Sequence, residues 1–299
     1  MTNRLELNWK LDGFVDEQRY YCSETPIDPL NPPAPKEILA GDVRTYTDTA
    51  IEVGKSYCVR LGSVKNDVEK ISTEKSVDTL FNNVELLIFA DSTTFPSTAI
   101  TDSSKTPKTL TKLGNVQIVS PTEYAKNYDD GWLKFDGSGD GLRATLTALG
   151  TADFTFEGYA SIYAGSSKVS GRIFHIGDTT AGTIIFHRYL STNQLAATLI
   201  NSSGYNTFIT TANTFVSGTK YHWCFMRKSG VFYILINGVV WGSSSAFIDF
   251  NITKTLLYIG SNNAATEELS AYMSSIRLTR HARYNTSGFT PPSFKFPKS

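Results

Sequence analysis

The chain has 299 residues, of which 40% are hydrophobic and 12% aromatic. That apolar content is enough for packed cores and excludes wholesale disorder, and the length allows two domains or one large β domain. The 28 basic residues balance the 28 acidic residues, so charge gives no reason to expect nucleic acid or an anionic membrane as a partner.

The N-terminal sequence and the cysteines bear on where the protein is made. The first residues, MTNRLELNWK, lack the apolar region of a signal peptide, and no run approaches the roughly 18 apolar residues of a membrane span. We therefore expect synthesis in a cytosol, no export by that route and no membrane insertion. Cys22, Cys58 and Cys224 lack metal-ligand spacing and are predicted to be reduced, mostly buried thiols, although a Cys22–Cys58 disulfide stays open.

Short strands separated by turn-forming residues are predicted from about Leu5 to Val77, at the spacing of a small β-sandwich. Residues 5–9 alternate apolar and polar side chains, and residues 19–22 and 56–64 are further strong strands. The proline-rich stretch from Thr25 to Glu37 cannot lie inside a paired strand, because proline lacks a backbone N–H donor. It is predicted to be a loop or a sheet edge.

This segment resembles a fibronectin type III domain. Trp9 lies at the position of that family's buried early-strand tryptophan, and the passage from Tyr46 to Arg60, YTDTAIEVGKSYCVR, is similar to the family's Y-x-D-x-x-(x)-x-x-G-x-x-Y-x-x-R. The resemblance implies that Tyr57 is the corner tyrosine, whose hydroxyl returns to the upstream backbone. It also implies a spacer or adhesive module without chemistry of its own.

A second series of strands follows the polar stretch at residues 69–83. A buried strand is predicted at residues 84–91 and a loop-like Ser/Thr-rich stretch at residues 92–112. Further strands are predicted at residues 154–160, 172–176, 183–188, 194–200, 206–211, 256–260 and 271–279. The spacing of a long amphipathic helix is absent throughout, which indicates an all-β domain.

Residues 220–242 are predicted to form three short strands joined by two tight turns. Alternate side chains of the first strand are expected on opposite faces: Tyr221, Trp223 and Phe225 on one, and His222, Cys224 and Met226 on the other. Residues 231–236 are apolar on both faces, as in the middle strand of a sandwich. Asn237-Gly238 is the strongest short signal of a type I′ turn, so an antiparallel core hairpin is predicted.

The run W-x-F-x-R-K-S-G-x-F-x-I-x-I-N-G in this hairpin is similar to the central hairpin of concanavalin A-like, laminin-G-like jelly-roll domains. The stretches LLIFAD, DSSKTPKTLTKLGNVQ and WLKFDGSGDGL resemble the N-terminal half of such domains in bacteriophage virion proteins. The segment RLTRHARYNTSGFTPPSFKFP, residues 277–297, resembles their closing passage. There Tyr284, Phe289, Phe294 and Phe296 are expected to hold an extended chain across an open face of the sandwich.

The predicted fold class is therefore all-β, with two domains. Residues 1–80 are assigned to a fibronectin type III-like, immunoglobulin-like sandwich, and residues 81–299 to a concanavalin A-like, laminin-G-like jelly roll. As is usual in jelly rolls, the last strand is expected to pair with the opening one. The sequence has no heptad pattern to drive a coiled coil, so a homo-oligomer stays open.

Concanavalin A-like folds include glucanases, which place two carboxylates at alternating positions on one strand face so that they flank the sugar bond. This sequence has no such spacing: Glu267 and Glu268 are adjacent and point to opposite faces, and Glu157 stands alone on its strand. No serine-elbow or cysteine-partner motif accompanies the histidines, which are His175, His187, His222 and His281. The sequence therefore favours a protein that is not an enzyme and has no cofactor.

The loop from Asp136 to Gly141, DGSGDG, is the best metal candidate, because two carboxylates in a glycine-rich loop could bind calcium. A twelve-residue calcium loop would need a glutamate at its end, where this chain has Thr147. In the resembled family this loop is a turn between strands. We therefore prefer a turn, leave calcium binding at Asp136 and Asp140 open, and assign no metal site.

Sugar binding would need an exposed aromatic platform beside polar groups. Trp132, Tyr189, Tyr205 and Trp241 lie near predicted strand ends or turns and are the candidates. The alternative for each is a place in the core or in an interface.

The two resemblances together imply a non-enzymatic structural protein of a bacteriophage virion, made in the host cytoplasm. A tail fibre, tip or baseplate component would attach to a host-surface glycan or contact other virion proteins. A capsid-surface decoration protein built from the same modules is the first alternative. A bacterial carbohydrate-binding protein or glycoside hydrolase is the alternative from another class.

Overall fold

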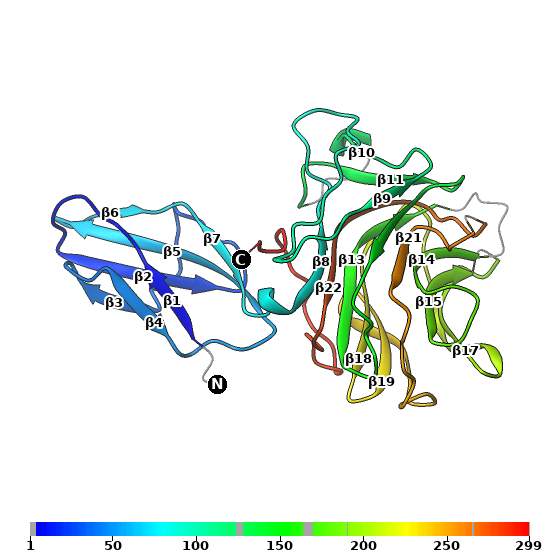
Figure 1. Cartoon of the computed structure of the whole chain (residues 1–299). Coiled ribbons are helices and arrows are strands. Elements are labelled where there is room, and N and C mark those ends of the chain that lie inside the picture. Colours follow the sequence, from blue (N-terminus) through cyan, green and yellow to red (C-terminus); the bar gives the residue numbers. More distant parts are fainter. Residues whose placement is uncertain (1–3, 124–127, 164–169, 190, 265, 299) are drawn as a thin grey trace. The chain divides into compact units, whose positions relative to one another are not determined.

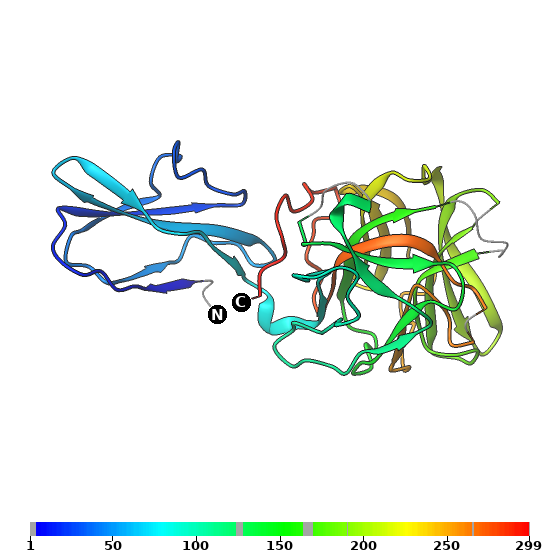
Figure 2. The same ribbon diagram turned by 90° about the horizontal axis from the view of Figure 1, so that it is seen from above.

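The computed structural model describes residues 4–123, 128–163, 170–189, 191–264 and 266–298. This part of the chain is almost entirely strands and loops (Figures 1 and 2), with two 3-10 turns, Phe81–Asn83 and Pro121–Glu123, as its helices. The predicted all-β class is confirmed. None of the helices among these residues has the length and apolar character needed to cross a membrane. The chain divides into two compact units, residues 1–82 with 292–299, and residues 83–291.

The first unit contains two antiparallel sheets (Figure 1). The smaller sheet pairs β1 (Leu5–Asn8) with β4 (Thr45–Asp48). The larger sheet has the order β3 (Glu37–Ala40), β2 (Glu17–Ser23), β5 (Ser56–Lys65) and β6 (Val68–Ile71), with β7 (Lys75–Asp78) also on β5. The proline-rich stretch before β3 is a loop, as predicted.

Aromatic and aliphatic side chains from both sheets form the core of the first unit. Tyr20, Tyr57 and Val59 of the larger sheet pack with Leu5 and Leu7 of β1. The Tyr57 hydroxyl accepts a hydrogen bond from the backbone N–H of Glu52 at 2.9 Å, which confirms the return to upstream backbone predicted for it. The assignment to the fibronectin type III family itself stays a prediction.

The three cysteines are free thiols, as predicted. Cys22 lies opposite Val59 in the β2–β5 pair, and Cys58 lies opposite Ser23. Cys22 packs on the side of Tyr20, whereas Cys58 packs on the side of Tyr21. The two thiols therefore point to opposite faces of the sheet, and a disulfide between them is incompatible with this register.

The second unit has two larger antiparallel sheets. The eight-stranded sheet has the order β10 (Gln117–Val119), β11 (Trp132–Asp136), β22 (Ser270–Thr279), β13 (Phe154–Ile162), β18 (Lys220–Lys228), β19 (Val231–Ile236) and β20 (Val239–Ser244), with β8 (Val84–Ile88) also on β22. The seven-stranded sheet has the order β17 (Gly204–Thr214), β16 (Gln194–Asn201), β15 (Thr183–Tyr189), β14 (Ser170–Ile176), β21 (Leu256–Ile259), β12 (Gly141–Thr145) and β9 (Thr111–Leu113). The last strand, β22, pairs with the opening strand, β8, as predicted.

The hairpin of β18 and β19 lies within the eight-stranded sheet and supplies much of the core, as predicted. Trp223 and Phe225 face the interior, where the Trp223 ring meets the Phe156 ring edge-on at 5.5 Å between centroids. Cys224 and Met226 pack on the opposite face. Asn237 and Gly238 join β19 to β20 with φ angles of 49° and 78°, the left-handed pair that a type I′ turn requires.

The two parts of the closing segment pack against different units. Tyr284 and Phe289 stack face to face, with ring centroids 3.6 Å apart, and cover Cys224 and Met226, which confirms their predicted role on the sheet. Phe294 instead packs against the Tyr21, Ile27 and Cys58 cluster of the first unit. Residues 292–299 therefore belong to the first unit, where the sequence had placed them with the jelly roll.

Candidate functional site

Glu157 lies at the centre of a buried ionic network on the face of the eight-stranded sheet that Tyr284 covers. Its side chain is fully buried. The Oε1 atom accepts hydrogen bonds from Arg277 Nε at 3.0 Å and Nη2 at 2.7 Å. The Oε2 atom lies 3.0 Å from His222 Nε2 and accepts a hydrogen bond from the Tyr284 hydroxyl at 2.5 Å.

This arrangement fixes the charge of the carboxylate. Burial alone would raise the pKa of Glu157, but Arg277, His222 and Arg283 outweigh burial and hold that pKa well below its usual range. Burial and the Glu157 charge raise the pKa of Tyr284, so its hydroxyl stays a donor. Glu157 is therefore an ionised anchor and lacks the proton that a general acid must deliver.

The same network explains the conspicuous sequence of the closing segment. Arg277 binds Glu157 directly, and Arg283 Nε lies 3.8 Å from the carboxylate while donating a hydrogen bond to Thr279 Oγ1 at 2.7 Å. The spacing R-x-T-x-x-x-R-Y thus places two guanidinium groups and one phenol around a single anion, and its threonine hydroxyl accepts a hydrogen bond from the second arginine. The pattern holds the closing segment onto the sheet.

The loop after β11 is organised by Asp140. This carboxylate is buried, accepts the backbone N–H of Asn115 at 2.7 Å with Oδ1, and accepts that of Asp136 at 3.0 Å with Oδ2. Gly139 donates its N–H to Glu268 Oε1 at 3.2 Å. Both oxygens of the Asp140 carboxylate therefore accept hydrogen bonds from backbone N–H groups, as expected of a residue that stabilises a turn. Among the described residues, no three His, Cys, Asp or Glu side chains gather closely enough to hold a metal ion.

The four aromatic candidates for sugar binding lie in different environments. Trp132 is fully buried, so the interpretation of it as an exposed platform is wrong. Trp241 is partly buried and packs edge-on against Phe215 and Tyr221, with centroids 5.9 and 6.1 Å away. It contributes mainly to the core. Tyr189 and Tyr205 remain, and both lie on the seven-stranded sheet.

The two tyrosines share the face of this sheet that points away from the core. Along β15, Ile184 and Phe186 pack inward, so His187 and Tyr189 point outward. The register carries this face across the neighbouring strands, where Arg172 lies opposite His187, Thr198 opposite Thr207, and Ile200 opposite Tyr205. We call this surface the tyrosine face, and its members are Arg172, His187, Tyr189, Thr198, Tyr205 and Thr207.

Hydrogen bonds and ring contacts tie the tyrosine face together. His187 Nε2 lies 3.0 Å from Thr198 Oγ1, which lies 2.8 Å from Thr207 Oγ1. The Tyr189 hydroxyl lies 3.4 Å from the same Thr207 oxygen, and its ring meets His187 edge-on at 4.9 Å. Tyr205 is 60% exposed and is the most accessible aromatic ring of this face. The result is an exposed ring beside hydroxyl groups on a rigid sheet.

Charge on the tyrosine face comes from Arg172, which forms an ion pair with Glu267. Glu267 also accepts a hydrogen bond from the Ser170 hydroxyl at 2.7 Å. Burial, reinforced by the positive charge of Arg172, lowers the pKa of His187 to about 3 and that of His175 to about 4. Both imidazoles are therefore neutral at physiological pH, and Arg172 is the cation of this surface.

The sequence missed Arg172 and the hydroxyl chain, because single polar residues alternating with apolar ones look like any exposed strand face. The sequence pattern marks Glu267 only as the neighbour of a second carboxylate. Its neighbour Glu268 does point the other way, toward the Gly139 backbone, as predicted. Only the pairing of β14 with β15 brings Arg172 beside His187, and that register cannot be read from composition.

Known families add an independent line of evidence. Residues 136–286, just over half of the chain, match the family described as the concanavalin A-like lectin/glucanases superfamily. The chain belongs to this superfamily. The match covers β12 to β22, and thus both the tyrosine face and the Glu157 network. No curated protein matches the sequence as a relative.

Solved structures agree with the superfamily assignment at the level of fold. The binding domain of botulinum neurotoxin serotype D/C VPI 5993 is similar at a TM-score of 0.50 and 13% identity, covering 68% of this chain and 50% of that chain. The binding domain of botulinum neurotoxin serotype C1 gives a TM-score of 0.50 and 10% identity, with coverage of 68% and 50%. This chain thus spans about half of the structures that it matches, and at these identities the likeness concerns the fold alone.

Proposed function

We propose that this protein is a non-enzymatic attachment protein of a bacteriophage virion, in which the tyrosine face binds a host-surface glycan. The observation that supports glycan binding is the exposed Tyr205 ring on the same sheet face as Tyr189, Thr207 and the Arg172–Glu267 pair. An aromatic ring stacks against the C–H face of a pyranose, and neighbouring hydroxyl and charged groups bond to its hydroxyls. Strands of a seven-stranded sheet hold these groups in place, so little order is lost on binding.

The arrangement of carboxylates supports the non-enzymatic part of the proposal. A glycosidase uses two carboxyl groups roughly 5–10 Å apart, one of which must carry a proton. Glu157 is buried and ionised among Arg277, His222 and Tyr284. Glu267, the carboxylate beside the tyrosine face, is already paired with Arg172. Neither is suited to donate a proton to a leaving group.

The virion location rests on the resemblance of the closing segment to phage jelly rolls. The structure gives that resemblance physical content, because the resembling residues Arg277, Thr279, Arg283 and Tyr284 all belong to the Glu157 network. Immunogold labelling of phage particles tests the location. Label at the tail supports attachment, label on the head supports the decoration role, and particles without label contradict a virion protein.

A glycan array tests the binding function. We expect the whole protein to retain a subset of glycans and the Tyr205→Ala variant to bind them about tenfold or more weakly, as for the loss of a central aromatic contact. Phe14→Ala is the matched control, since Phe14 is a 90% exposed aromatic residue of the first unit. Equal binding by the wild type and Tyr205→Ala would contradict the tyrosine face, and release of reducing sugar would favour a hydrolase.

A further inference from the structure

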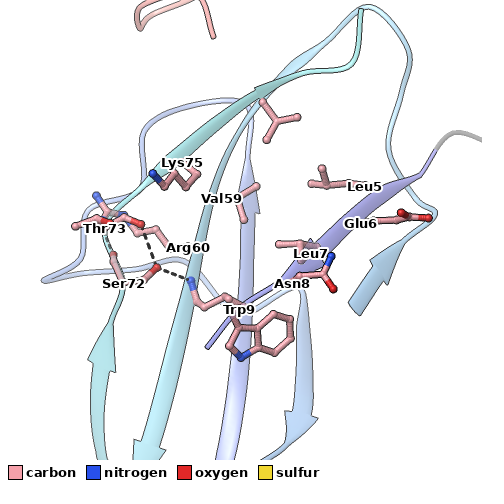
Figure 3. Close-up of a pocket in the computed structure, with 12 residues that line it drawn as sticks. Leu5, Glu6, Leu7, Asn8, Trp9, Val59, Arg60, Ser72, Thr73 and Lys75 are labelled. Carbon is pink, nitrogen blue, oxygen red and sulfur yellow. Dashed lines mark hydrogen bonds between the residues drawn. The ribbon is translucent and has the colours of Figure 1, made fainter. Parts of the chain in front are cut away.

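The first unit carries a hollow of about 340 Å³ that the glycan-binding proposal does not use (Figure 3). Its walls come from β1, β5 and β7 and from the turn between β6 and β7. The lining residues are Leu5, Glu6, Leu7, Asn8, Trp9, Val59, Arg60, Leu61, Ser72, Thr73, Lys75 and Val77. All of them belong to the first unit.

The hollow follows the free edge of β1. Leu5 and Leu7 point into the core, whereas Glu6 and Asn8 alternate with them and are exposed. Because residues of both faces line the same hollow, it must run along the side of the strand and not over one face. Among the described residues β1 pairs with β4 alone, so its second edge has no neighbouring strand.

The backbone groups on this edge can be assigned from the register. The N–H of Trp9 donates to the carbonyl of Arg44 at 3.1 Å, toward β4. In an antiparallel ladder alternate residues bond to the same neighbour, so Leu5 and Leu7 also bond to β4. The N–H and C=O groups of Glu6 and Asn8 then point the other way, into the hollow, where the described residues provide no partner.

The floor and rim of the hollow define what would fit there. Val59, Leu61 and Val77 supply an apolar floor from the larger sheet. The Lys75 side chain is exposed and lines the hollow (Figure 3), and its ammonium group forms no ion pair within the described part of the chain. Arg60, by contrast, is already bound to the Ile27 carbonyl and to Glu74.

We propose that this edge receives a β-strand from another protein, which adds to β1 and fills the hollow. The four backbone groups of Glu6 and Asn8 would pair with the incoming strand, as in β-strand addition to an exposed sheet edge. Alternate apolar side chains of that strand would lie on Val59, Leu61 and Val77, and an acidic side chain would meet Lys75. The partner is thus an extended segment of alternating apolar residues with a carboxylate.

A designed peptide tests this proposal without knowledge of the natural partner. The probe is an acetylated peptide of about ten residues in which valine alternates with threonine and aspartate, a length typical of strands. The control peptide has the same composition with its valines grouped together. Hydrogen exchange of the full chain is followed by NMR. We expect the alternating peptide to slow exchange at the Glu6 and Asn8 amides, and the control peptide to leave it unchanged.

Variants at the edge sharpen the test. Asn8→Pro removes one free N–H without touching the bonds to β4, and we expect about tenfold weaker peptide binding, whereas Asn8→Thr keeps the affinity. Lys75→Glu should weaken binding and reverse its dependence on salt, because salt then screens a repulsion, and it serves as a second variant if Asn8→Pro fails to fold. Unchanged exchange at Glu6 and Asn8 with excess peptide would overturn the proposal. If the Glu6 and Asn8 amides already exchange slowly without peptide and sedimentation shows dimers, the proposal is overturned and a second copy of this chain occupies the edge.

Discussion

Glu157 and Arg277 face each other across the pairing of β13 with β22, fully buried, with Arg277 Nη2 2.7 Å from Glu157 Oε1. Such a pair holds two strands in register only while both partners are present. Removing one partner leaves the charge of the other buried and uncompensated, and the protein then loses about 3–5 kcal/mol of stability.

We expect Glu157→Ala to lower the free energy of unfolding of the second unit by about that amount, because Arg277 and Arg283 would both lose their counter-ion. Urea unfolding followed by the fluorescence of Trp132 and Trp223, both buried in this unit, measures it. Glu52→Ala is the control, since Glu52 lies at the surface, and it should leave the midpoint unchanged. An equally unaffected midpoint for Glu157→Ala would show that the network contributes nothing.

Stability should fall as the solution is acidified, and the histidines should set where the fall begins. The folded-state pKa values of His175 and His187, about 4 and about 3, lie below their ordinary value of 6.5. From pH 6.5 downward the unfolded chain therefore binds protons that the folded chain does not, and each histidine lowers stability by up to about 1.4 kcal/mol per pH unit. The effect ends near pH 4 for His175 and near pH 3 for His187.

Glu157 affects stability only at lower pH. Because its pKa is depressed in the folded state, its contribution to stability is fully present above its ordinary pKa near 4.5 and is lost as the pH falls below that value. Melting temperatures between pH 7 and pH 5 thus test the histidines above the window of Glu157, whereas Asp129 and Asp140, whose pKa values burial raises, would add stability as the pH falls. His187→Gln should reduce the pH dependence over that interval by about half, because His175 still contributes, while the exposed His281→Gln should retain it. The same slope in both variants would refute the assignment.

The turn at Asp140 allows a test of calcium. Asp140→Ala should destabilise the second unit by about 1–3 kcal/mol, because the N–H groups of Asn115 and Asp136 would lose their acceptor. Calcium should leave the melting temperature of the wild type unchanged, since the carboxylate is already used by the backbone. A rise in melting temperature with calcium, abolished by Asp140→Ala, would instead establish a metal site.

Substitutions at two glycines distinguish the effect of backbone strain on stability from the effect of losing the packing of the closing segment. Gly204 (φ +97°) has open space around its missing Cβ, whereas a Cβ at Gly238 (φ +78°) would meet the Phe289 carbonyl oxygen. Gly204→Ala should lower stability by about 1–2 kcal/mol through strain alone. Gly238→Ala should lower it further and expose the chain around Phe289 to limited proteolysis, mapped by mass spectrometry. Equal effects of the two substitutions would argue against docking.

Local pattern was sufficient for most strands and for the central hairpin. The alternation of Trp223 and Phe225 with Cys224 and Met226, and the Asn237-Gly238 turn, depend on short-range periodicity and on φ preferences, and both were predicted correctly. The Glu157 network could be predicted only in part. The sequence marked the closing segment as special, but it could not show that a carboxylate far away in the chain is what its arginines bind.

The candidate site was harder to predict for a physical reason. Whether an aromatic ring becomes a platform or part of the core depends on which strand covers it. Trp132 lies in β11, between β10 and β22, and is buried, whereas Tyr205 extends from β17 at the edge of its sheet. Both look alike in sequence, as aromatic residues beside turns. Long-range pairing decides between them.

The packing of Phe294 on Tyr21 and Ile27 has a consequence for biosynthesis. The first unit draws on residues 1–82 and on residues 292–299, so the whole jelly roll is translated between its two portions. The unit that leaves the ribosome first must wait for that last short piece, and until then a patch around Ile27 stays uncovered.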